Sequence, residues 1–282
     1  MHSFQAWQSK MRNNGIAVVV DQFFDDQLVL DSLQVRNSPL SDPSRSWIQK
    51  IKSEWKLALK YRKDRFILNP YRWLRGTATS ADGFTWHMRG TPDASMPLNH
   101  EEWLEPILPV KDGLFVDVGA HVGSWSVRCS KRFNEVVAFE PVPETREILE
   151  KNLALNHCHN IGIMPYALGG ADTYRSMNVE GFLGHSSILP RKSPKRVIQV
   201  PVRKLDDFGL SPDFLKIDVE GFEKEVVEGG IETLRRTRRI VIEVHDRKEL
   251  PYFEKLLSSF GMATRVVSLG AHQGQTHLVG EK

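Results

Sequence analysis

The chain has 282 residues, of which 40% are hydrophobic and 26% charged, and its formal net charge is +3. These values are ordinary for a globular protein and exclude a chain that is disordered throughout. The length suits one large α/β domain with an extension, because single cores rarely exceed about 250 residues. No apolar run approaches the ~20 residues of a membrane helix, and we expect no secretory signal. Two cysteines, Cys129 and Cys158, favour a reduced, cytoplasmic setting.

Residues 1–110 form a predicted N-terminal accessory region. Short apolar runs predict strands at Ile16–Val20 and Gln27–Leu33. A further short strand is expected at Phe84–Met88, within a stretch rich in Gly, Thr, Ser, Pro and Asp. A helix at His100–Leu108 would then lead into the second part of the chain.

Residues 45–75 contain ten Lys or Arg side chains against two acidic ones, a local charge of +8. Trp47, Ile51 and Trp55 recur at helical spacing, which predicts an amphipathic helix with a basic outer face. Such a face suits contact with an anionic polymer or a membrane surface. A helix that packs by its aromatic side and leaves its basic side in water explains the pattern equally well.

The segment 113–126, GLFVDVGAHVGSWS, predicts a buried strand, a glycine turn and a helix that begins at Ser124. Ligands bind at the carboxyl ends of strands in open α/β sheets. The dinucleotide fingerprint G-x-G-x-x-G is excluded, because His121 stands where its second glycine would be. The spacing D-x-G-x-x-x-G resembles that of class I S-adenosylmethionine-dependent methyltransferases instead.

After residue 110, strands and helices alternate as in a doubly wound, mostly parallel sheet, which makes residues 111–282 the predicted methyltransferase domain. The expected strands are Leu114–Val118, Glu135–Phe139, Ile161–Leu168, Phe214–Val219 and Ile240–His245. The expected helices are Ser124–Phe133, Pro143–Leu155, Glu223–Arg236 and Lys248–Phe260. An insertion with short strands over the site is expected at 169–200. A closing antiparallel hairpin is expected at Thr264–Leu269 and Gln275–Val279.

Glu140 ends the second strand of this domain, close to where a doubly wound fold places the acid that binds ribose hydroxyls. The amides of the turn and of the helix start suit the carboxylate of a methionine moiety. His121 could add a contact there or be a turn residue only, and Tyr166 could line adenine or merely pack. The predicted cofactor-binding residues are Asp117, Gly119, His121, Gly123, Ser124, Glu140, Tyr166 and Ala167.

Four ionisable residues lie at the carboxyl ends of the fourth and fifth expected strands. Asp218 and Glu220 are two positions apart, as are Glu243 and His245, so in an extended backbone each pair shares a face. We predict that all four are catalytic. His245 is the first candidate for a general base because imidazole titrates near neutral pH. Asp218 and Glu220 are alternatives that could instead hold the substrate or, with Glu243, a divalent metal; no ligand set is fixed, so no metal is assigned.

Seven motifs in a fixed order resemble the FkbM family of methyltransferases. They are DVGAHVG at 117–123, AFEP at 138–141, NLALN at 152–156, YALGG at 166–170, KLDDF at 204–208, KIDVEGFEKEVVEGG at 216–230 and IEVH at 242–245. The resemblance implies a Rossmann-like class I fold, S-adenosylmethionine as cofactor, and O-methylation of a hydroxyl on a sugar, glycan or natural product. His121 stands where the family often has Asn, and Phe222 where a small residue is frequent; both departures affect the shape of the pocket.

Two rival functions remain at this point. The basic segment suits a nucleic-acid methyltransferase, although Asn69-Pro70-Tyr71 lacks the second proline of amino-methylating DNA enzymes. A non-catalytic binding module that keeps the fold is the other rival, since fold alone does not decide function. The sequence does not determine the oligomeric state.

Overall fold

The structure is a computed structural model that describes residues 76–80, 82–88, 113–179, 196–268 and 276–282. The chain divides into two compact units, Met1–His100 and Glu101–Lys282. The basic helix within 45–75 and the elements expected at 16–20, 27–33 and 100–108 lie outside the described residues, so they stay predictions, as does the domain boundary near residue 110. Among the described helices, none is long and apolar enough to cross a membrane.

The first unit contains one described hairpin, in which β1 (Gly76–Thr79) pairs antiparallel with β2 (Thr85–Met88). Trp86 is buried, and its indole N–H donates to the Ser80 hydroxyl at 2.9 Å. The strand expected at Phe84–Met88 is therefore confirmed, whereas β1 was not predicted.

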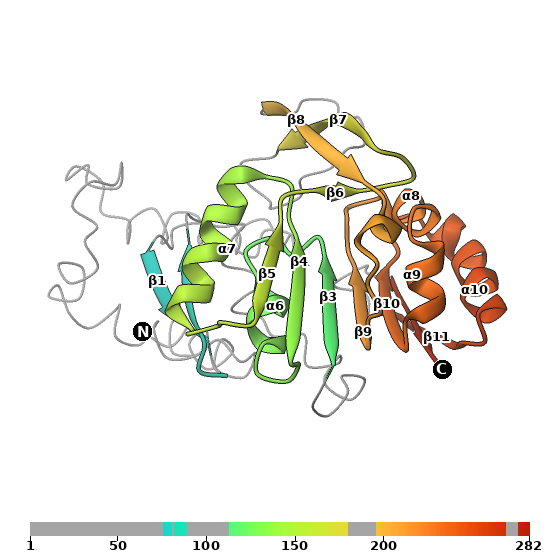
Figure 1. Cartoon of the computed structure of the whole chain (residues 1–282), viewed down its shortest axis with the longest axis horizontal. Helices are drawn as coiled ribbons and strands as arrows, with labels where there is room; N and C mark the ends of the chain where they lie inside the picture. Colours follow the sequence, from blue (N-terminus) through green and yellow to red (C-terminus); the bar gives the residue numbers. More distant parts are fainter. Residues whose placement is uncertain (1–75, 81, 89–112, 180–195, 269–275) are drawn as a thin grey trace, which may run out of the picture. The chain divides into compact units, whose positions relative to one another are not determined.

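The second unit contains a seven-stranded sheet, a three-stranded sheet and flanking helices (Figure 1). The strands are β3 (Leu114–Val118), β4 (Glu135–Phe139), β5 (Ile161–Met164), β6 (Ala167–Leu168), β7 (Thr173–Val179), β8 (Arg196–Arg203), β9 (Phe214–Ile217), β10 (Arg239–Glu243), β11 (Ala263–Ser268) and β12 (Thr276–Glu281). The helices are α6 (Ser124–Cys129), α7 (Pro143–Leu155), α8 (Glu223–Glu228), α9 (Ile231–Arg236) and α10 (Leu250–Ser259), with 3-10 turns η4 (Leu205–Phe208) and η5 (Arg247–Glu249).

The large sheet has the order β11-β12-β10-β9-β3-β4-β5. Neighbouring strands from β10 to β5 are parallel, and β12 runs antiparallel to both β10 and β11. This is the expected doubly wound sheet with an antiparallel closing hairpin. The chain order reverses between β3 and β9, so the crevice beyond the carboxyl ends of these two strands is the topological switch point, where such folds bind ligands.

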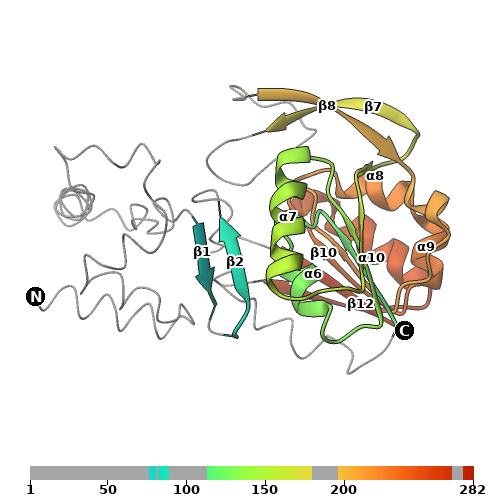
Figure 2. The same ribbon diagram turned by 60° about the vertical axis from the view of Figure 1, so that its left-hand side comes forward.

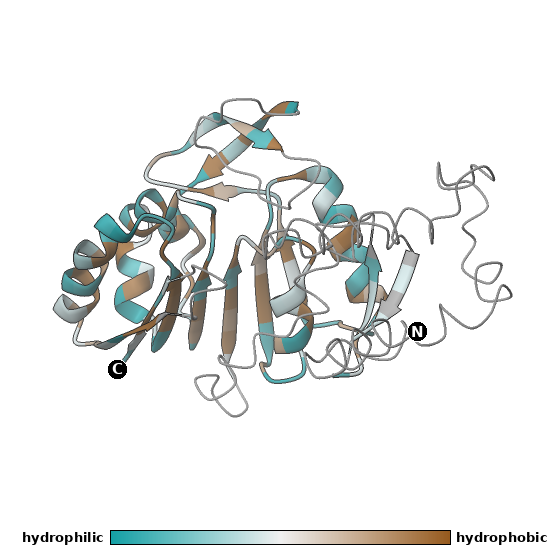
Figure 3. Cartoon of the chain, turned by 180° about the vertical axis from the view of Figure 1, so that it is seen from behind, coloured by the Kyte–Doolittle hydropathy of each residue, from teal (hydrophilic) through white to brown (hydrophobic). Residues whose placement is uncertain are grey.

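The pleat of the strands sends alternate side chains into two separate cores, and both faces of the sheet are apolar as a buried parallel sheet requires (Figure 3). One face packs against α6, and the other packs against α8, α9 and α10; Figure 2 shows these helices on opposite sides of the sheet. The core on the α6 face contains Phe115, Trp125, Cys129, Phe133, Val136, Phe214, Val241 and Val279.

The three-stranded sheet, in the order β6-β8-β7, confirms that strands follow residue 169, although β7 and β8 are longer than the short strands expected. Its buried side chains Met177, Val200 and Val202 cluster with Val142, just after the carboxyl end of β4. This sheet therefore lies beyond the carboxyl edge of the large sheet, as Figures 1 and 2 show.

Several expected elements end earlier than predicted, and two of them have a clear local reason. The strand expected at Ile161–Leu168 is two strands, β5 and β6, in different sheets; Pro165 between them has no N–H for a continuous ladder. The helix expected at Ser124–Phe133 ends at Cys129. There the side-chain amide of Asn160 donates to the carbonyls of Ser130 and Phe133, which satisfies them outside a helix.

The helix expected at Glu223–Arg236 is also two helices, α8 and α9, which are separated by Gly229 and Gly230. A Cβ at Gly229 would lie 2.0 Å from the carbonyl oxygen of Gly169, and a Cβ at Gly230 would lie 3.0 Å from the Leu205 side chain. Close approach of another backbone segment, rather than helix propensity, therefore sets the break.

The contact at Gly229 yields a stability prediction. We expect Gly229→Ala to destabilise the fold by about 1–3 kcal/mol, because the added methyl group overlaps a backbone oxygen that is held in place. Gly170→Ala is the matched control, since its nearest neighbouring atom would be 4.0 Å away. Chemical unfolding of both variants measures the difference, and equal stability would contradict the explanation of the helix break.

Candidate active site

The register of the parallel strands aligns the predicted site residues in one row. Val118 pairs with Phe139 on one side and with Ile217 on the other, and Ile217 pairs with Ile242. The next residue on each strand is Gly119, Glu140, Asp218 and Glu243, respectively. The glycine turn, the ribose candidate and two of the catalytic candidates therefore share one edge of the sheet.

The glycine turn after β3 depends on two positive-φ glycines. Gly119 has φ 81°, and a Cβ there would lie 1.9 Å from the backbone oxygen of Asp218. Gly123 has φ 90°, and a Cβ there would lie 2.3 Å from the side chain of Leu149. Only glycine fits such close approaches, so these residues bring the turn against β9 and α7.

Glu140 is buried, and two backbone amides hold its carboxylate. Oε2 accepts from the N–H of His121 at 3.0 Å, and Oε1 accepts from the N–H of Val142 at 2.9 Å. A carboxylate can accept several hydrogen bonds at once. Glu140 is thus fixed beside the turn as a hydrogen-bond acceptor, which fits the predicted ribose contact.

His121 contributes its backbone to this arrangement. Its φ is 52°, in the left-handed region that Asn visits more readily than His, which accounts for the preference for Asn that the sequence resemblance implies at this position. The donated N–H supports the interpretation of His121 as a turn residue, while a side-chain contact with the cofactor stays a prediction.

Asn152 is a positioning residue that sequence reasoning missed. It lies fully buried on α7, and its side-chain amide donates to the carbonyl of Val122 within the turn at 2.8 Å. The available signal was an Asn among apolar residues of the helix, where an amide needs a specific partner.

The side chains of Asp117 and Ser124 each form a hydrogen bond with a residue of α6. Asp117 is 1% exposed and accepts a hydrogen bond from the Ser126 hydroxyl at 2.6 Å. Burial raises the pKa of its carboxyl despite the nearby charge of Lys216. The Ser124 hydroxyl accepts from the Arg128 guanidinium at 2.8 Å. The bond between Asp117 and Ser126 attaches α6 to β3, whereas the bond between Ser124 and Arg128 lies within α6. A direct cofactor contact by Asp117 or Ser124 stays a prediction.

Tyr166 and Ala167 follow β5 but lead away from the large sheet. The Tyr166 ring lies 5.8 Å from the ring of Phe208 and 5.7 Å from the Arg203 guanidinium carbon. Ala167 is buried at the start of β6 among residues of the three-stranded sheet. Packing explains both positions, and the adenine contact stays a prediction.

A buried lysine, also missed from the sequence, neutralises part of the acidic row. Lys216 is 5% exposed, and its Nζ lies 3.1 Å from Oδ2 of Asp218 and 4.0 Å from Oδ1 of Asp117. Burial alone would raise the pKa of Asp218, but the charges of Lys216 and His245 outweigh it and hold that pKa below its usual range. A lysine inside the apolar strand FLKI was a sign of a buried ion pair.

His245 lies among carboxylates. Its Nδ1 is 3.0 Å from Oε1 of Glu223, while its Nε2 is 3.5 Å from Glu220 and 3.6 Å from Glu243. Burial lowers the pKa of the imidazole, but the hydrogen bond and charge of Glu223, together with the charges of Asp218 and Glu243, raise it to about 9. His245 is therefore an imidazolium at neutral pH in the protein alone.

Glu243 and His277 extend the row to β12. The two residues are paired across β10 and β12, and Nε2 of His277 lies 3.5 Å from Oε2 of Glu243. Burial, with a contribution from Asp218, raises the pKa of Glu243 despite both histidines. His277 was not predicted, because it belongs to the closing hairpin and only the tertiary fold brings it here.

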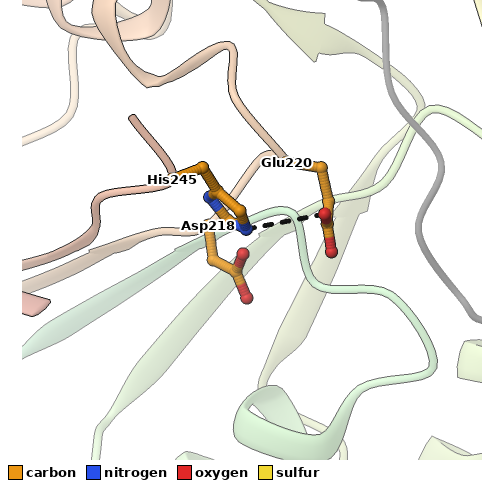
Figure 4. Close-up of side chains that lie close together, drawn as sticks. All are labelled: Asp218, Glu220 and His245. Atoms are coloured by element: carbon orange, nitrogen blue, oxygen red, sulfur yellow. Dashed lines mark ion pairs between the residues drawn. The ribbon is translucent and has the colours of Figure 1, made fainter. Parts of the chain in front are cut away.

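Glu220 reaches the cluster by a different route from the one expected. Its φ is 57°, so the backbone after β9 turns there instead of continuing as a strand. The expectation that Asp218 and Glu220 share a strand face was wrong, because β9 ends at Ile217 and β10 at Glu243. The turn nevertheless places Asp218, Glu220 and His245 together (Figure 4). One carboxylate oxygen of each acid and one ring nitrogen of the histidine lie within 4.8 Å of one another.

The methyltransferase FkbM domain model matches residues 117–265, slightly more than half of the chain. The chain belongs to the FkbM methyltransferase family. The protein is thus a Rossmann-like methyltransferase, and S-adenosylmethionine is its cofactor. Within the described residues, Glu140 and the turn at 119–123 are the groups that suit its ribose and methionine portions.

Curated relatives of this FkbM protein come from an archaeon and from fungi. The hexuronic acid methyltransferase AglP of Haloferax volcanii is 25% identical over 177 residues, which cover 56% of this chain and 67% of the relative. Methyltransferase sdnD of Sordaria araneosa is 27% identical, with coverage of 52% and 72%. A solved structure, methyltransferase FkbM from Methylobacillus flagellatus KT, is 18% identical with a TM-score of 0.47, and the match spans 62% of this chain and 45% of that one.

Glu140 gives a binding prediction for this FkbM enzyme. We expect Glu140→Ala to weaken S-adenosylmethionine about 10- to 100-fold, because a hydrogen bond to a charged group contributes roughly 1.5–3 kcal/mol. Isothermal titration calorimetry measures the effect, with Glu150→Ala, an exposed residue of α7, as the control. Unchanged affinity in a folded Glu140→Ala protein would remove this residue from the cofactor site.

The charge balance gives a prediction about metals. We expect turnover to survive EDTA, because Lys216 and the imidazolium of His245 already supply positive charge beside Asp218 and Glu220. Activity and metal content after chelation and gel filtration check this expectation. Loss of activity that Mg²⁺ or Mn²⁺ restores would contradict it.

Proposed function

We propose that this protein transfers the methyl group of S-adenosylmethionine to a hydroxyl oxygen of a sugar, glycan or related small molecule. The observation that carries the proposal is the position of His245. Its Nε2 lies among the side chains that follow β9 and β10, on the same sheet edge as the glycine turn and Glu140. A proton acceptor beside the cofactor loop is what methylation of a weakly nucleophilic hydroxyl requires.

When bound, the cofactor supplies an electrophilic methyl group on a cationic sulfonium, whose sulfur becomes a neutral thioether once the methyl group is transferred. In this proposal Nε2 of neutral His245 takes the hydroxyl proton as the acceptor oxygen bonds to the methyl carbon. Glu220 and Glu243 lie beside Nε2 and stabilise the imidazolium that forms. Asp218 is paired with Lys216 and has a lowered pKa, so it is a weaker base than His245.

The charge of the cluster favours a small hydroxyl acceptor over the polyanionic backbone of a nucleic acid at the reacting edge. Among the described residues of the cluster, the four carboxylates of Asp218, Glu220, Glu223 and Glu243 outnumber its one lysine and two histidines, Lys216, His245 and His277. A phosphate backbone would meet like charges there. Contact of an anionic polymer with residues 45–75 is compatible with this proposal, as a second site on the same chain.

The sugar acceptor is supported by the relative from Haloferax volcanii, which is named a hexuronic acid methyltransferase. Transfer of isotopically labelled methyl to a panel of neutral sugars, uronic acids, polyols and RNA tests the proposal. Labelled methyl ethers on hydroxyl acceptors would support it. Label on RNA alone, or cofactor binding without transfer to any acceptor of the panel, would favour the rival functions.

The raised pKa of His245 predicts how turnover depends on pH. Below about 9 most of the imidazole is protonated and unable to accept a proton, so kcat/KM should rise about tenfold per pH unit and level off above that value. The pH profile of kcat/KM for the labelled-methyl reaction measures this. A flat profile between pH 6 and pH 9 would remove His245 as the base.

Substitution tests the same role independently. We expect His245→Ala to lower turnover by ~10²- to 10⁴-fold, the usual contribution of general-base catalysis, with S-adenosylmethionine affinity largely kept. His159→Ala, an exposed histidine after α7, is the control. Full turnover in folded His245→Ala would shift the role of base to Asp218 or Glu220.

A further inference from the structure

Glu223 is a wholly buried glutamate at the first position of α8, with 0% of its surface exposed. Its Oε1 accepts the backbone N–H of Gly221 at 2.8 Å and lies 3.0 Å from Nδ1 of His245. The carboxylate therefore connects the turn after β9 with the ring of the histidine after β10. Placing an acid in this position is costly unless it has a specific partner.

These contacts determine which nitrogen of His245 carries a fixed proton. Because a carboxylate oxygen accepts hydrogen bonds, we assign Nδ1 as the donor of this contact. Nε2 is then the nitrogen that faces Glu220 (Figure 4), at 3.5 Å, and it lies 3.6 Å from Glu243. Both distances are longer than the 3.0 Å contact between Nδ1 and Glu223, so Glu223 makes the best-formed of these three contacts of the ring.

We propose that Glu223 is the positioning residue of this methyltransferase, which fixes the tautomer and orientation of His245 so that Nε2 faces the acceptor hydroxyl. The inference rests on the proposed function, in which His245 is the base. The physical logic is that of a histidine base oriented by a buried carboxylate. Glu223 touches neither cofactor nor acceptor in this assignment and acts only through the imidazole.

Every element around the ring contributes a charged or titratable group. Asp218 and Lys216 come from β9, Glu220 from the turn after it, Glu243 from β10 and His277 from β12. Glu223 differs from these groups in two respects, because it alone contacts Nδ1 and it is fully buried. Its removal should therefore change both the charge and the orientation of the ring, whereas removal of the others changes mainly the charge.

Two substitutions separate charge from orientation. Glu223→Gln keeps an oxygen that can accept from Nδ1 but removes the negative charge, and Glu223→Ala removes both. We expect the pKa of His245, followed by imidazole NMR, to fall by about 1–3 units in Glu223→Gln, with the rise of kcat/KM moving to lower pH by the same amount. At the pH-independent plateau, Glu223→Ala should lose about 10- to 100-fold more kcat than Glu223→Gln, while acceptor KM stays within about threefold.

Glu228→Gln is the matched control, since it makes the same chemical change at an exposed position of the same helix. Circular dichroism and thermal unfolding establish that each variant is folded. An unchanged His245 pKa in both folded Glu223 variants would overturn the proposal. A shifted pKa with an unshifted activity profile would leave the coupling in place and reject His245 as base, which separates the failure of this inference from that of the proposed function.

Discussion

The parallel register around β3 is the constraint on which the rest of this protein depends. Because Val118, Phe139, Ile217 and Ile242 are aligned across four strands, the chain leaves all four at the same level. The turn that begins at Gly119 can then approach the backbone of Asp218 so closely that no Cβ fits. A shift of one residue in any pair would turn the polar side chains of that strand toward the opposite, apolar core.

A second theme is the way in which a charged cluster is stabilised inside an apolar sheet. On the α6 face, the strand ends carry Asp117, Lys216, Asp218, Glu243 and His277, while the opposite face of the same strands is aliphatic. Burial works against every one of these charges, and paired opposite charges offset it. The carboxylates of Glu223, Asp218 and Glu243 raise the pKa of His245 to about 9, so the cluster also sets the pH at which this residue can act as a base.

The sequence predicted the core of the domain because its periodic signals were strong and local. β3, β4 and α7 have the bounds expected from apolar runs, and α7 begins with the proline that suits a first helical turn. Errors occurred where distant segments decide the outcome. The break between α8 and α9 follows from contact with Gly169, sixty residues earlier, and the change of sheet at Pro165 follows from pairing with β8. Pro165 and the pair Gly229-Gly230 were local signs of an interruption, but the distant segments that meet them cannot be read from the local sequence.

The sequence by itself determined the family, and it predicted the glycine turn with Glu140 beside it as the cofactor site, because motif spacing along a strand-turn-helix reflects local backbone geometry. It also determined that Asp218, Glu220, Glu243 and His245 belong to one edge, since carboxyl ends of parallel strands meet there. Only the tertiary structure decided their partners. Lys216, Glu223 and His277 come from a strand interior, a helix start and a closing hairpin. Electrostatic interaction depends on distance through space, so the charge state of His245 became known only when these segments were folded together.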